Sequence, residues 1–188
     1  MEIRQATLED SSEIAKVQVE SYRTVYRDIF PPAYLEHFTL QEQEQDWREL
    51  LSSDDHEVLY VALVNEKIIA YALGTSNEDE GFPFESELVA LHVHEKHQRN
   101  GVGRALFAAV AKALQAKGNN SLSLWVAAKN PARAFYKKLG GELVGEKPWV
   151  NNSYFGTRIF EVAYGWHDIR SIFEKKAISI RDNTGLQV

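Results

Sequence analysis

Hydrophobic residues recur at two different spacings along the chain, and the spacing predicts where helices and strands lie. In residues 10–30 the apolar side chains follow the three- and four-residue spacing of a helix, which must end before Pro31. The segments VLYVALV (58–64) and IIAYALGT (68–75) alternate with a period of two and flank a short turn, so they are predicted to form a hairpin. ELVALHV (87–93) is predicted to be a further strand.

The strongest helical pattern covers residues 103–118, where Gly118 is predicted to end the helix. Another helix is predicted at 130–140, with Asn130 as its N-cap and Pro131 at its first helical position. This order of elements predicts a mixed α/β fold in a single domain. Shorter periodic segments predict the remaining elements. These are helices from Pro32 and at 41–51, and strands at 2–7, 121–126, 141–147 and 157–166.

The composition and the charge restrict the possible functions. A chain of 188 residues suits one domain with a sizeable core, and it carries a net charge of -6 with a pI near 5.5. Nucleic-acid binding is therefore not expected, because neutralising phosphates requires a basic surface. The absence of cysteine excludes disulfides and a thiolate nucleophile. The sequence has no signal-peptide pattern and no apolar run of membrane-spanning length, so we expect a cytoplasmic protein without a membrane partner.

The stretch HQRNGVGRAL (97–106) places two glycines against the start of the long helix. It is not a P-loop, because Gly103 is followed by Arg104 and Ala105 rather than by lysine and a hydroxyl residue. It is not a dinucleotide fingerprint either, because the third glycine is replaced by Leu106. A helix N-terminus offers unpaired N–H groups, and glycines there let an anion approach the backbone. An ordinary left-handed turn explains the glycine pair equally well.

Two separated motifs in this region resemble the signature of the GNAT superfamily of N-acetyltransferases. The loop QRNGVG (98–103) matches the superfamily pattern Gln/Arg-x-x-Gly-x-Gly/Ala. About thirty residues later, Asn130 is followed by Tyr136 and then by Leu139-Gly140, which matches the second motif. The opening ATLEDSSEIAKVQVESYRTVYRDIFPPAYL is also similar to the start of many small bacterial members.

The resemblance implies a GNAT-like domain over residues 1–164, with a mostly antiparallel central sheet splayed around the coenzyme A site and helices on both faces. Residues 165–188 would form a C-terminal extension with a short helix and a frayed end. The implied co-substrate is acetyl-CoA, and no metal is expected. Its pantetheine arm would pair with the backbone of β-strand residues, its pyrophosphate would lie on the glycine-loop amides, and an asparagine would hold the other side of the arm. The implied binding residues are Leu91, His92, Val93, Arg99, Asn100, Gly101, Val102, Gly103, Arg104 and Asn130.

The implied reaction is attack of a neutral amine on a thioester, which requires an oxyanion donor and a proton for the departing thiolate. By the family pattern, the backbone N–H of Val93 is the donor and Tyr136 is the acid. A phenol of pKa about 10 and a thiol of pKa about 8.5 are matched closely enough that the transfer costs about 2 kcal/mol. Without that pattern, Tyr136 would be a core aromatic residue. Glu87 is the candidate base, since strand alternation should place its side chain on the same face as that of Val93; the alternative is a solvated carboxylate at a strand end.

These residues predict an acetyl-CoA-dependent N-acetyltransferase that works by direct transfer, because the chain has no cysteine to carry an acyl group. The expected acceptor is a small primary amine. Acetylation of a protein lysine or N-terminus is a second hypothesis, although Trp125 stands where relatives that acetylate a ribosomal-protein N-terminus carry Glu. A catalytically silent CoA-binding sensor or interaction module is a third. A homodimer formed through the last strands or the tail is compatible with the sequence.

Three further groups of side chains have competing interpretations. His92, His94 and His97 are interpreted as solvated residues rather than metal ligands, because no carboxylate completes a set. The alternative is that His92 or His94 serves as a base or lines the site. Glu78, Asp79, Glu80 and Glu85 belong to a predicted exposed loop at 76–86, which would steer a cationic acceptor. Aromatic residues recur every four positions at Tyr22, Tyr26, Phe30, Tyr34 and Phe38. They are interpreted as core packing, with Tyr26 or Phe30 as a substrate contact.

Overall fold

One seven-stranded mixed sheet organises the computed structural model, which describes residues 1–36, 38–53, 58–77, 81–149 and 159–174. The strand order is β1-β2-β3-β4-β5-β7-β6. Neighbouring strands are antiparallel except for β4 and β5, which are parallel. The strands are β1 (Glu2–Gln5), β2 (Val58–Val64), β3 (Lys67–Ser76), β4 (Ser86–Val93), β5 (Leu122–Ala127), β6 (Glu142–Pro148) and β7 (Phe160–Trp166).

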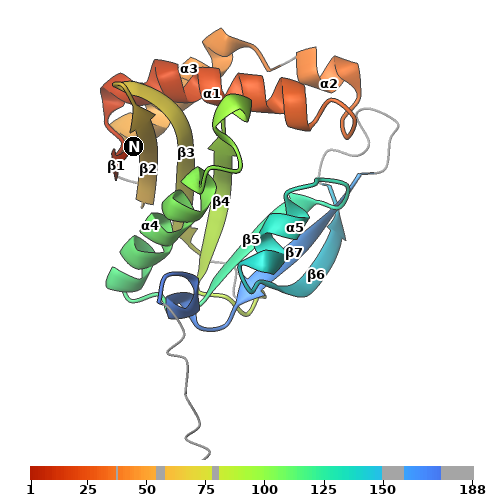
Figure 1. Ribbon diagram of the computed structural model, residues 1–188. Helices are drawn as coiled ribbons and strands as arrows, with labels where there is room; N and C mark the ends of the chain where they lie inside the picture. The colour runs from red at the N-terminus through yellow and green to blue at the C-terminus, as the bar shows by residue number, and fades with distance from the viewer. Residues whose placement is uncertain (37, 54–57, 78–80, 150–158, 175–188) are drawn as a thin grey trace, which may run out of the picture.

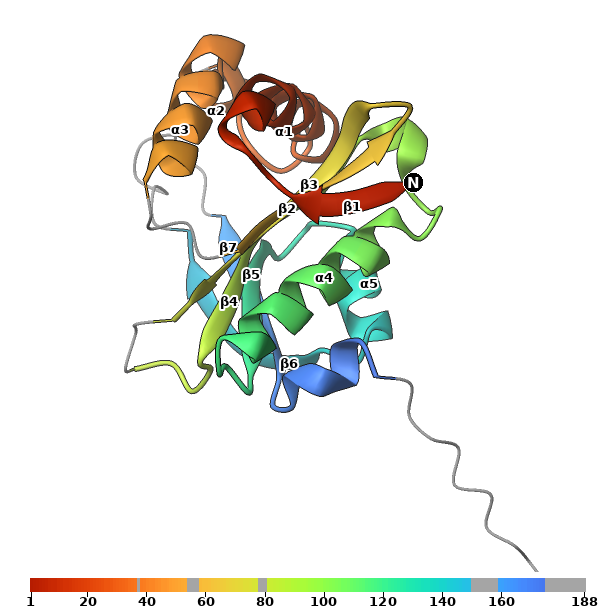
Figure 2. The ribbon, with the colours of Figure 1, turned by 90° about the vertical axis from the view of Figure 1, so that its left-hand side faces the viewer.

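Helices cover both faces of this sheet, as Figures 1 and 2 show together. On one face, α1 (Ser11–Val25) and α3 (Leu40–Ser52) pack on β2 and β3, and the short α2 (Pro32–Glu36) connects them. On the other face lie α4 (Val102–Ala116) and α5 (Arg133–Lys138). The predicted mixed α/β fold with helices on both faces is therefore confirmed. The described residues also include three short 3-10 segments: η1 (Leu8–Asp10), η2 (Glu95–His97) and η4 (Ile169–Ile172).

Two helix boundaries differ from the sequence-based expectation. The first helix ends at Val25 instead of continuing to residue 30, and the chain forms a turn at 26–30 in which the N–H groups of Ile29 and Phe30 both donate to the carbonyl of Tyr26. The helix predicted from Pro131 begins at Arg133. Asn130 instead caps the turn before the helix, where its Oδ1 accepts a hydrogen bond from the backbone N–H of Ala132 at 2.8 Å.

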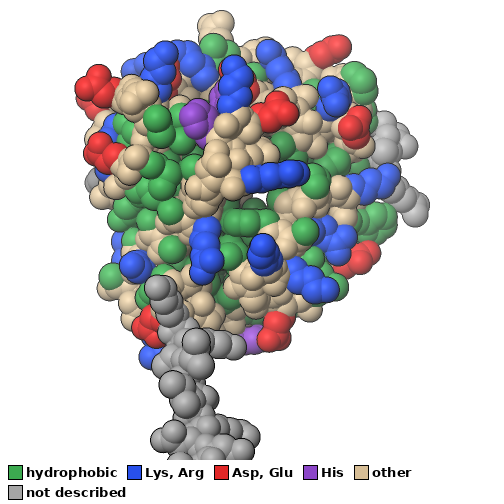
Figure 3. Space-filling model, in the orientation of Figure 1, with side chains coloured by type: hydrophobic (Ala, Val, Ile, Leu, Met, Phe, Trp, Pro, Cys, Tyr) green, Lys and Arg blue, Asp and Glu red, His purple; other side chains and the backbone are tan. Residues whose placement is uncertain are grey.

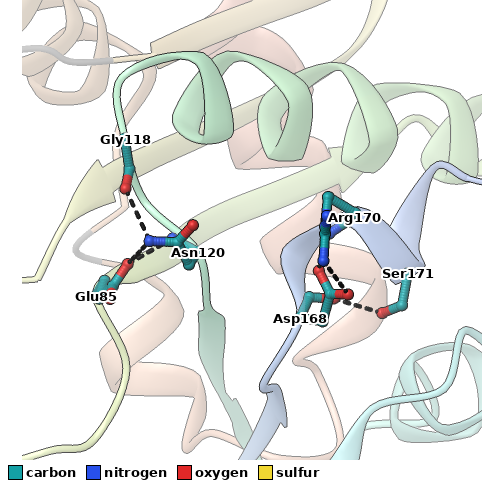
Figure 4. Close-up of polar contacts among 6 residues, drawn as sticks. All are labelled: Glu85, Gly118, Asn120, Asp168, Arg170 and Ser171. Atoms are coloured by element: carbon teal, nitrogen blue, oxygen red, sulfur yellow. Dashed lines mark hydrogen bonds and ion pairs between the residues drawn. The ribbon is translucent and has the colours of Figure 1, made fainter.

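Residues beyond 164 also take part in the core. Trp166, Ile169 and Ile172 are buried, and η4 packs against α4. The backbone N–H of Ile169 donates to the carbonyl of Asn120 at 2.8 Å, and the carboxylate of Asp168 caps the first turn of η4 (Figure 4). The short helix expected in the extension is therefore present as a 3-10 turn, whereas the expected frayed end lies outside the described residues.

The parallel strands β4 and β5 touch at one end and separate at the other. Among the described residues, Glu87 and Ser123 are the one pair of these two strands in register. A network of buried serines holds this closed end: Ser86 Oγ donates to the carbonyl of Ser121 at 2.7 Å, and Ser123 Oγ donates to the carbonyl of Ser86 at 3.3 Å. Figure 4 shows the outer part of the network, where the carboxylate of Glu85 accepts hydrogen bonds from the backbone and side chain of Asn120.

A β-bulge in β4 changes which face its side chains occupy. Leu73 of β3 lies opposite Ala90, but the next residue, Gly74, lies opposite Leu88, so Val89 has no partner across the strand pair. The alternation of side chains therefore shifts by one residue. The prediction that Glu87 and Val93 share a face is wrong for this reason: Val93 faces α4, whereas Glu87 faces the side covered by α1.

The serine network predicts a measurable contribution to stability. Replacement Ser86→Ala removes the donor to the carbonyl of Ser121 and leaves that acceptor buried without its partner, so the free energy of unfolding should fall by about 1–3 kcal/mol. Ser52→Ala is the matched control, because the Ser52 hydroxyl makes a similar bond to the Arg48 carbonyl on the exposed face of α3. For this control, the free energy of unfolding measured in urea should change by less than about 0.5 kcal/mol. Equal losses in both variants would contradict the importance of the network.

Candidate active site

A cleft of about 660 Å³ opens where β4 and β5 separate. Its walls come from residues 88–93 of β4 and 124–126 of β5, and its far end reaches the first residues of α4 and one side of α5. Two residues of η4, Ser171 and Ile172, complete the wall. In Figure 3 lysine and arginine side chains gather around a hollow on this face, and the cleft lining includes Arg99, Arg104 and Lys138.

The edge of β4 presents free backbone groups to this cleft. The N–H of His94 donates to the carbonyl of Ile69 in β3, at 2.9 Å. Because successive N–H groups of a strand point in opposite directions, those of Leu91 and Val93 point away from β3 and towards β5. The carbonyl of Val93 already accepts a hydrogen bond from Gln98 Nε2 at 3.1 Å, a contact that the sequence did not predict.

The two glycines at the start of α4 have different physical roles. Gly101 has a φ of +82°, so the left-handed turn considered from the sequence is present, and a Cβ at this position would meet open space. Gly103 has ordinary helical geometry, and its Cβ would make normal contacts at 3.6 Å with Phe135 and Val93. Arg99 also has a positive φ, of 61°, so the loop turns sharply and directs the first helical N–H groups at the cleft.

Asn130 connects the loop after β5 with α1 across the cleft. Its backbone N–H donates to the carbonyl of Ala127 at 2.8 Å, and its side chain also makes a hydrogen bond with the hydroxyl of Tyr26. Burial raises the pKa of Tyr26 to about 12, and the hydrogen bond with Asn130 acts in the opposite direction. Both residues line the cleft, so Tyr26 is the aromatic residue of α1 that reaches it.

Tyr136 lies at the boundary between the core and the cleft. It is buried against Phe107 and Tyr164, which satisfies the core interpretation, and it also lines the cleft. Burial raises the pKa of Tyr136 well above the usual phenol value, and Tyr26 raises it further. Full proton transfer from this phenol to a thiolate therefore costs more than the 2 kcal/mol expected from ordinary pKa values, unless the bound thioester changes its surroundings.

Glu87 is half-buried at the closed end of the strand pair, and it is not among the residues that line the cleft. Burial raises the pKa of its carboxyl, while Lys147 lowers it. The interpretation as a simple solvated carboxylate therefore does not fit. Trp125 projects from the same face of β5, and Lys147 Nζ lies 3.9 Å from the centroid of its ring.

The five aromatic residues between Tyr22 and Phe38 form a closed ring of their own. Successive ring centroids lie 4.2–5.4 Å apart, and Phe38 closes the circle by stacking on Tyr22. The interpretation as core packing holds for Phe30, which is buried, although the five residues pack on one another apart from the two larger hydrophobic clusters. Of these five residues, Tyr26 is the one that lines the cleft.

His92 projects into the space beside this aromatic ring. Its imidazole stacks between Tyr22 and Tyr71, with centroid distances of 5.6 and 5.2 Å. Burial lowers the pKa of His92 to about 4, so the imidazole is neutral at pH 7. The expectation of a solvated histidine is therefore wrong at this position, and the side chain lies on the α1 side while its backbone lines the cleft.

The remaining groups lie outside the cleft. His94 pairs with Glu20 at 3.0 Å and stacks edge-on with His97. Within the described residues, no three His, Asp or Glu side chains are arranged to hold a metal ion. Of the predicted acidic loop, residues 78–80 lie outside the described part, and Glu85 binds Asn120 instead of facing solvent freely. Every helix in the described part of the chain is too short or too polar to cross a bilayer.

Comparison with known proteins identifies the family. Residues 19–141 match the model of the acetyltransferase (GNAT) family. An uncharacterized N-acetyltransferase of Bacillus subtilis (strain 168), YuaI, is 36% identical over 174 residues, which cover 90% of this chain and 95% of that protein. The chain therefore belongs to the GNAT family and is an N-acetyltransferase, as the loop at 98–103 and the asparagine–tyrosine motif predict.

Solved structures of low sequence identity share the fold. A PaiA N-acetyltransferase from Thermoplasma acidophilum in complex with coenzyme A has a TM-score of 0.70 and 18% identity, over 88% of this chain and 98% of that chain. A ribosomal-protein-alanine N-acetyltransferase from Brucella melitensis has a TM-score of 0.62 and 20% identity, over 88% and 99%. At these identities the likeness extends to the architecture alone.

The burial of His92 predicts a specific pH dependence of stability. Its folded pKa of about 4 is lower than the ordinary value of about 6.5, so the unfolded chain takes up a proton that the folded chain does not. The resulting stability is complete above pH 6.5 and is lost as the pH falls towards 4, by up to about 3 kcal/mol. Imidazole NMR titration should show the low midpoint. His92→Phe should flatten the change in urea-unfolding free energy between pH 7.5 and pH 5, and an ordinary midpoint for His92 would contradict the assignment.

Proposed function

We propose that this protein transfers acetyl from acetyl-CoA directly to a small primary amine. The observation that carries the proposal is the unpaired edge of β4, where the N–H groups of Leu91 and Val93 face a cleft that ends at the N-terminus of α4. An extended acyl-pantetheine arm can add to this edge as a further strand does. Without the separation of β4 and β5, the same backbone groups would be satisfied within the sheet.

The positive end of the cleft fits a diphosphate. The first N–H groups of α4 have no partner inside the helix, and Gly101 leaves open space in front of them. Arg99 and Arg104 line the same end and add formal positive charge. Asn130 lies on the opposite wall, where it would contact the pantetheine chain from the β5 side.

The neighbouring residues supply the groups that the reaction requires. Acetyl-CoA provides an activated thioester, and the backbone N–H of Val93 is directed at the carbonyl oxygen that becomes negative as the amine attacks. Tyr136 remains protonated at neutral pH and donates its hydrogen to the departing sulfur. The high pKa of this buried phenol favours donation that accompanies C–S cleavage, rather than transfer after a free thiolate has formed.

The aromatic ring supports a small acceptor. Tyr26 lines the cleft, and the other four side chains pack with it in a closed ring. A protein lysine or N-terminus needs an open groove along which several residues can lie. The fold alone does not separate these acceptors, because a ribosomal-protein-alanine N-acetyltransferase has the same architecture.

A thiol-release assay with acetyl-CoA and a panel of amines, amino acids and peptides tests the reaction and the acceptor class together. Tyr136→Phe keeps the ring that packs on Phe107 but removes the hydroxyl, so kcat should fall by about 10²–10⁴-fold while acetyl-CoA binding is retained. Lys137→Ala is the control on the same helix, because Lys137 is exposed and does not line the cleft. Unchanged turnover in Tyr136→Phe would refute the role of the phenol, and activity confined to the peptides would refute a small acceptor.

The glycine at the start of α4 can be tested separately. Asparagine tolerates the left-handed backbone, so Gly101→Asn should fold normally while its side chain fills the open space in front of the helix N-terminus. We expect the dissociation constant for CoA, measured by calorimetry, to rise at least about tenfold, which corresponds to 1.4 kcal/mol. Gly118→Asn is the matched control, because Gly118 has a φ of +100° and open space at the other end of the same helix. Equal affinity in the two variants would contradict a diphosphate at the α4 N-terminus.

A further inference from the structure

We propose that the acetyl acceptor is a primary amine carried on an apolar or aromatic body, without a second charged group. This inference rests on the proposed acetyl transfer and names the chemical class of its acceptor. The body lies between Val89 and Trp125 on the sheet and Val25 and Tyr26 on α1, and all four of these residues line the cleft.

The cleft reaches both faces of the sheet. Its lining includes Arg104 of α4 and Phe135 of α5, and it also includes Ser21, Val25 and Tyr26 of α1, the helix on the opposite face (Figure 2). The diphosphate site at the start of α4 places the donor on the α4 side. The acceptor amine therefore approaches the thioester from the α1 side.

Val89 and Trp125 occupy corresponding positions on the two strands that separate. Each lies two residues beyond the Glu87–Ser123 pair that joins β4 to β5. The residues on either side of Trp125 pack in the core beneath α4, so the indole projects to the α1 side. Val89, at the bulge, is 50% exposed, and it is the one exposed large hydrophobic residue in the described part of the chain that lines the cleft. An exposed apolar residue in a concave wall fits an apolar ligand group.

Neighbouring side chains hold the indole of Trp125 in place. The Phe82 ring centroid lies 5.3 Å from the indole, and Lys147 Nζ lies 3.9 Å from its ring centroid. A Cβ at Gly145 would come within 3.1 Å of the indole, so the backbone of β6 also packs closely against it. Because an ammonium group already lies over the indole, a second cation there is repelled, whereas an apolar or aromatic group can pack on the remaining surface.

The charges along the cleft suit the donor and leave none for a second charge on the acceptor. The formally charged residues of the lining are all basic and lie around the donor: Arg99, Arg104 and Lys138. No Asp or Glu among the described residues lines the cleft, and Glu87 and Glu161 on the α1 side interact electrostatically with Lys147 instead. A diamine would therefore place its second ammonium group in a partly enclosed site without a counter-charge, which weakens binding.

The reaction is the proposed acetyl transfer with this amine as the nucleophile. The amine nitrogen forms the C–N bond, the C–S bond breaks, and its electron pair leaves with the sulfur, which takes the proton of Tyr136. The extra proton on nitrogen passes to solvent, and solvent returns a proton to Tyr136. Apolar surroundings favour the uncharged amine, which is the form that attacks the thioester.

Three amines separate the effect of the body from the effect of charge. They are 2-phenylethylamine, n-butylamine and 1,4-diaminobutane, which is n-butylamine with a second amino group. In thiol release by the full-length protein at saturating acetyl-CoA, we expect kcat/KM for 2-phenylethylamine to exceed that for n-butylamine about tenfold and that for 1,4-diaminobutane about 100-fold. Equal or greater activity with 1,4-diaminobutane than with 2-phenylethylamine would overturn the proposal.

Variants of the two strand residues test where the body lies. Trp125→Ala should reduce the preference for 2-phenylethylamine over n-butylamine at least about fivefold, whereas Trp125→Phe should retain most of it. Val89→Asp places a carboxylate in the cleft, so kcat/KM for 1,4-diaminobutane relative to n-butylamine should rise about tenfold. Leu143→Asp is the matched control and should change neither preference, because Leu143 is 61% exposed on β6 and does not line the cleft.

Val89→Asp keeps the test decisive even if Trp125→Ala does not fold, because Val89 is half-exposed and has no partner across β3. Preferences that stay unchanged in Trp125→Phe, Trp125→Ala and Val89→Asp alike would refute this position of the acceptor.

A binding measurement decides the proposal if the wild-type protein releases no thiol with any amine, in which case the proposed function has failed. Each amine is then titrated into the CoA-saturated protein while the indole N–H of Trp125 is followed by NMR, with Trp125→Phe to assign its signal. A shift caused by 2-phenylethylamine and not by 1,4-diaminobutane supports the apolar acceptor site. No shift, or an equal shift with both amines, overturns it.

Discussion

The contact between β4 and β5 at Glu87 and Ser123 is the constraint on which the rest of the site depends. The buried hydroxyls of Ser86 and Ser123 and the Glu85–Asn120 pair hold the strands together at this end. Beyond it the strands diverge, and the backbone groups of β4 lose the partners that a regular sheet would supply. Because the two strands are joined at this end only, a cleft opens between them at the other end. The backbone groups exposed there can pair with a ligand or with water in place of the missing strand.

The separation also divides the site into two chemically different sides. The α4 side offers helix N–H groups and the guanidinium groups of Arg99 and Arg104, which suit an anionic donor. The α1 side offers Tyr26 and Trp125, which suit the apolar body of an amine. The bulge at Val89 contributes to this division, because it turns Glu87 away from the side that Val93 faces.

Burial that stabilises the fold also sets the protonation of the side chains near the cleft. Tyr136 and Tyr26 are held as neutral phenols, and His92 is held as a neutral imidazole between two tyrosine rings. Each group is therefore suited to donate a hydrogen bond or to pack, and less suited to carry charge. Burial instead raises the pKa of two carboxyl groups on the α1 side of the sheet, those of Glu87 and Glu161.

The sequence by itself determined the local elements and the two family motifs. Helical and alternating periods depend on which face of a single segment is buried, so they identified the strands β2 to β4 and the helix α4. The glycine loop and the Asn130–Tyr136 motif identified the acetyltransferase family. The tertiary structure decided what depends on register between distant strands. A one-residue bulge reversed the face of Glu87, the aromatic residues from Tyr22 to Phe38 packed into a closed ring, and the pairing of β5 with β7 brought Glu161 to the α1 side of the sheet. The physical reason is that the register between two strands depends on contacts between segments that are distant in the sequence. The residue pattern of either strand alone does not specify its partner.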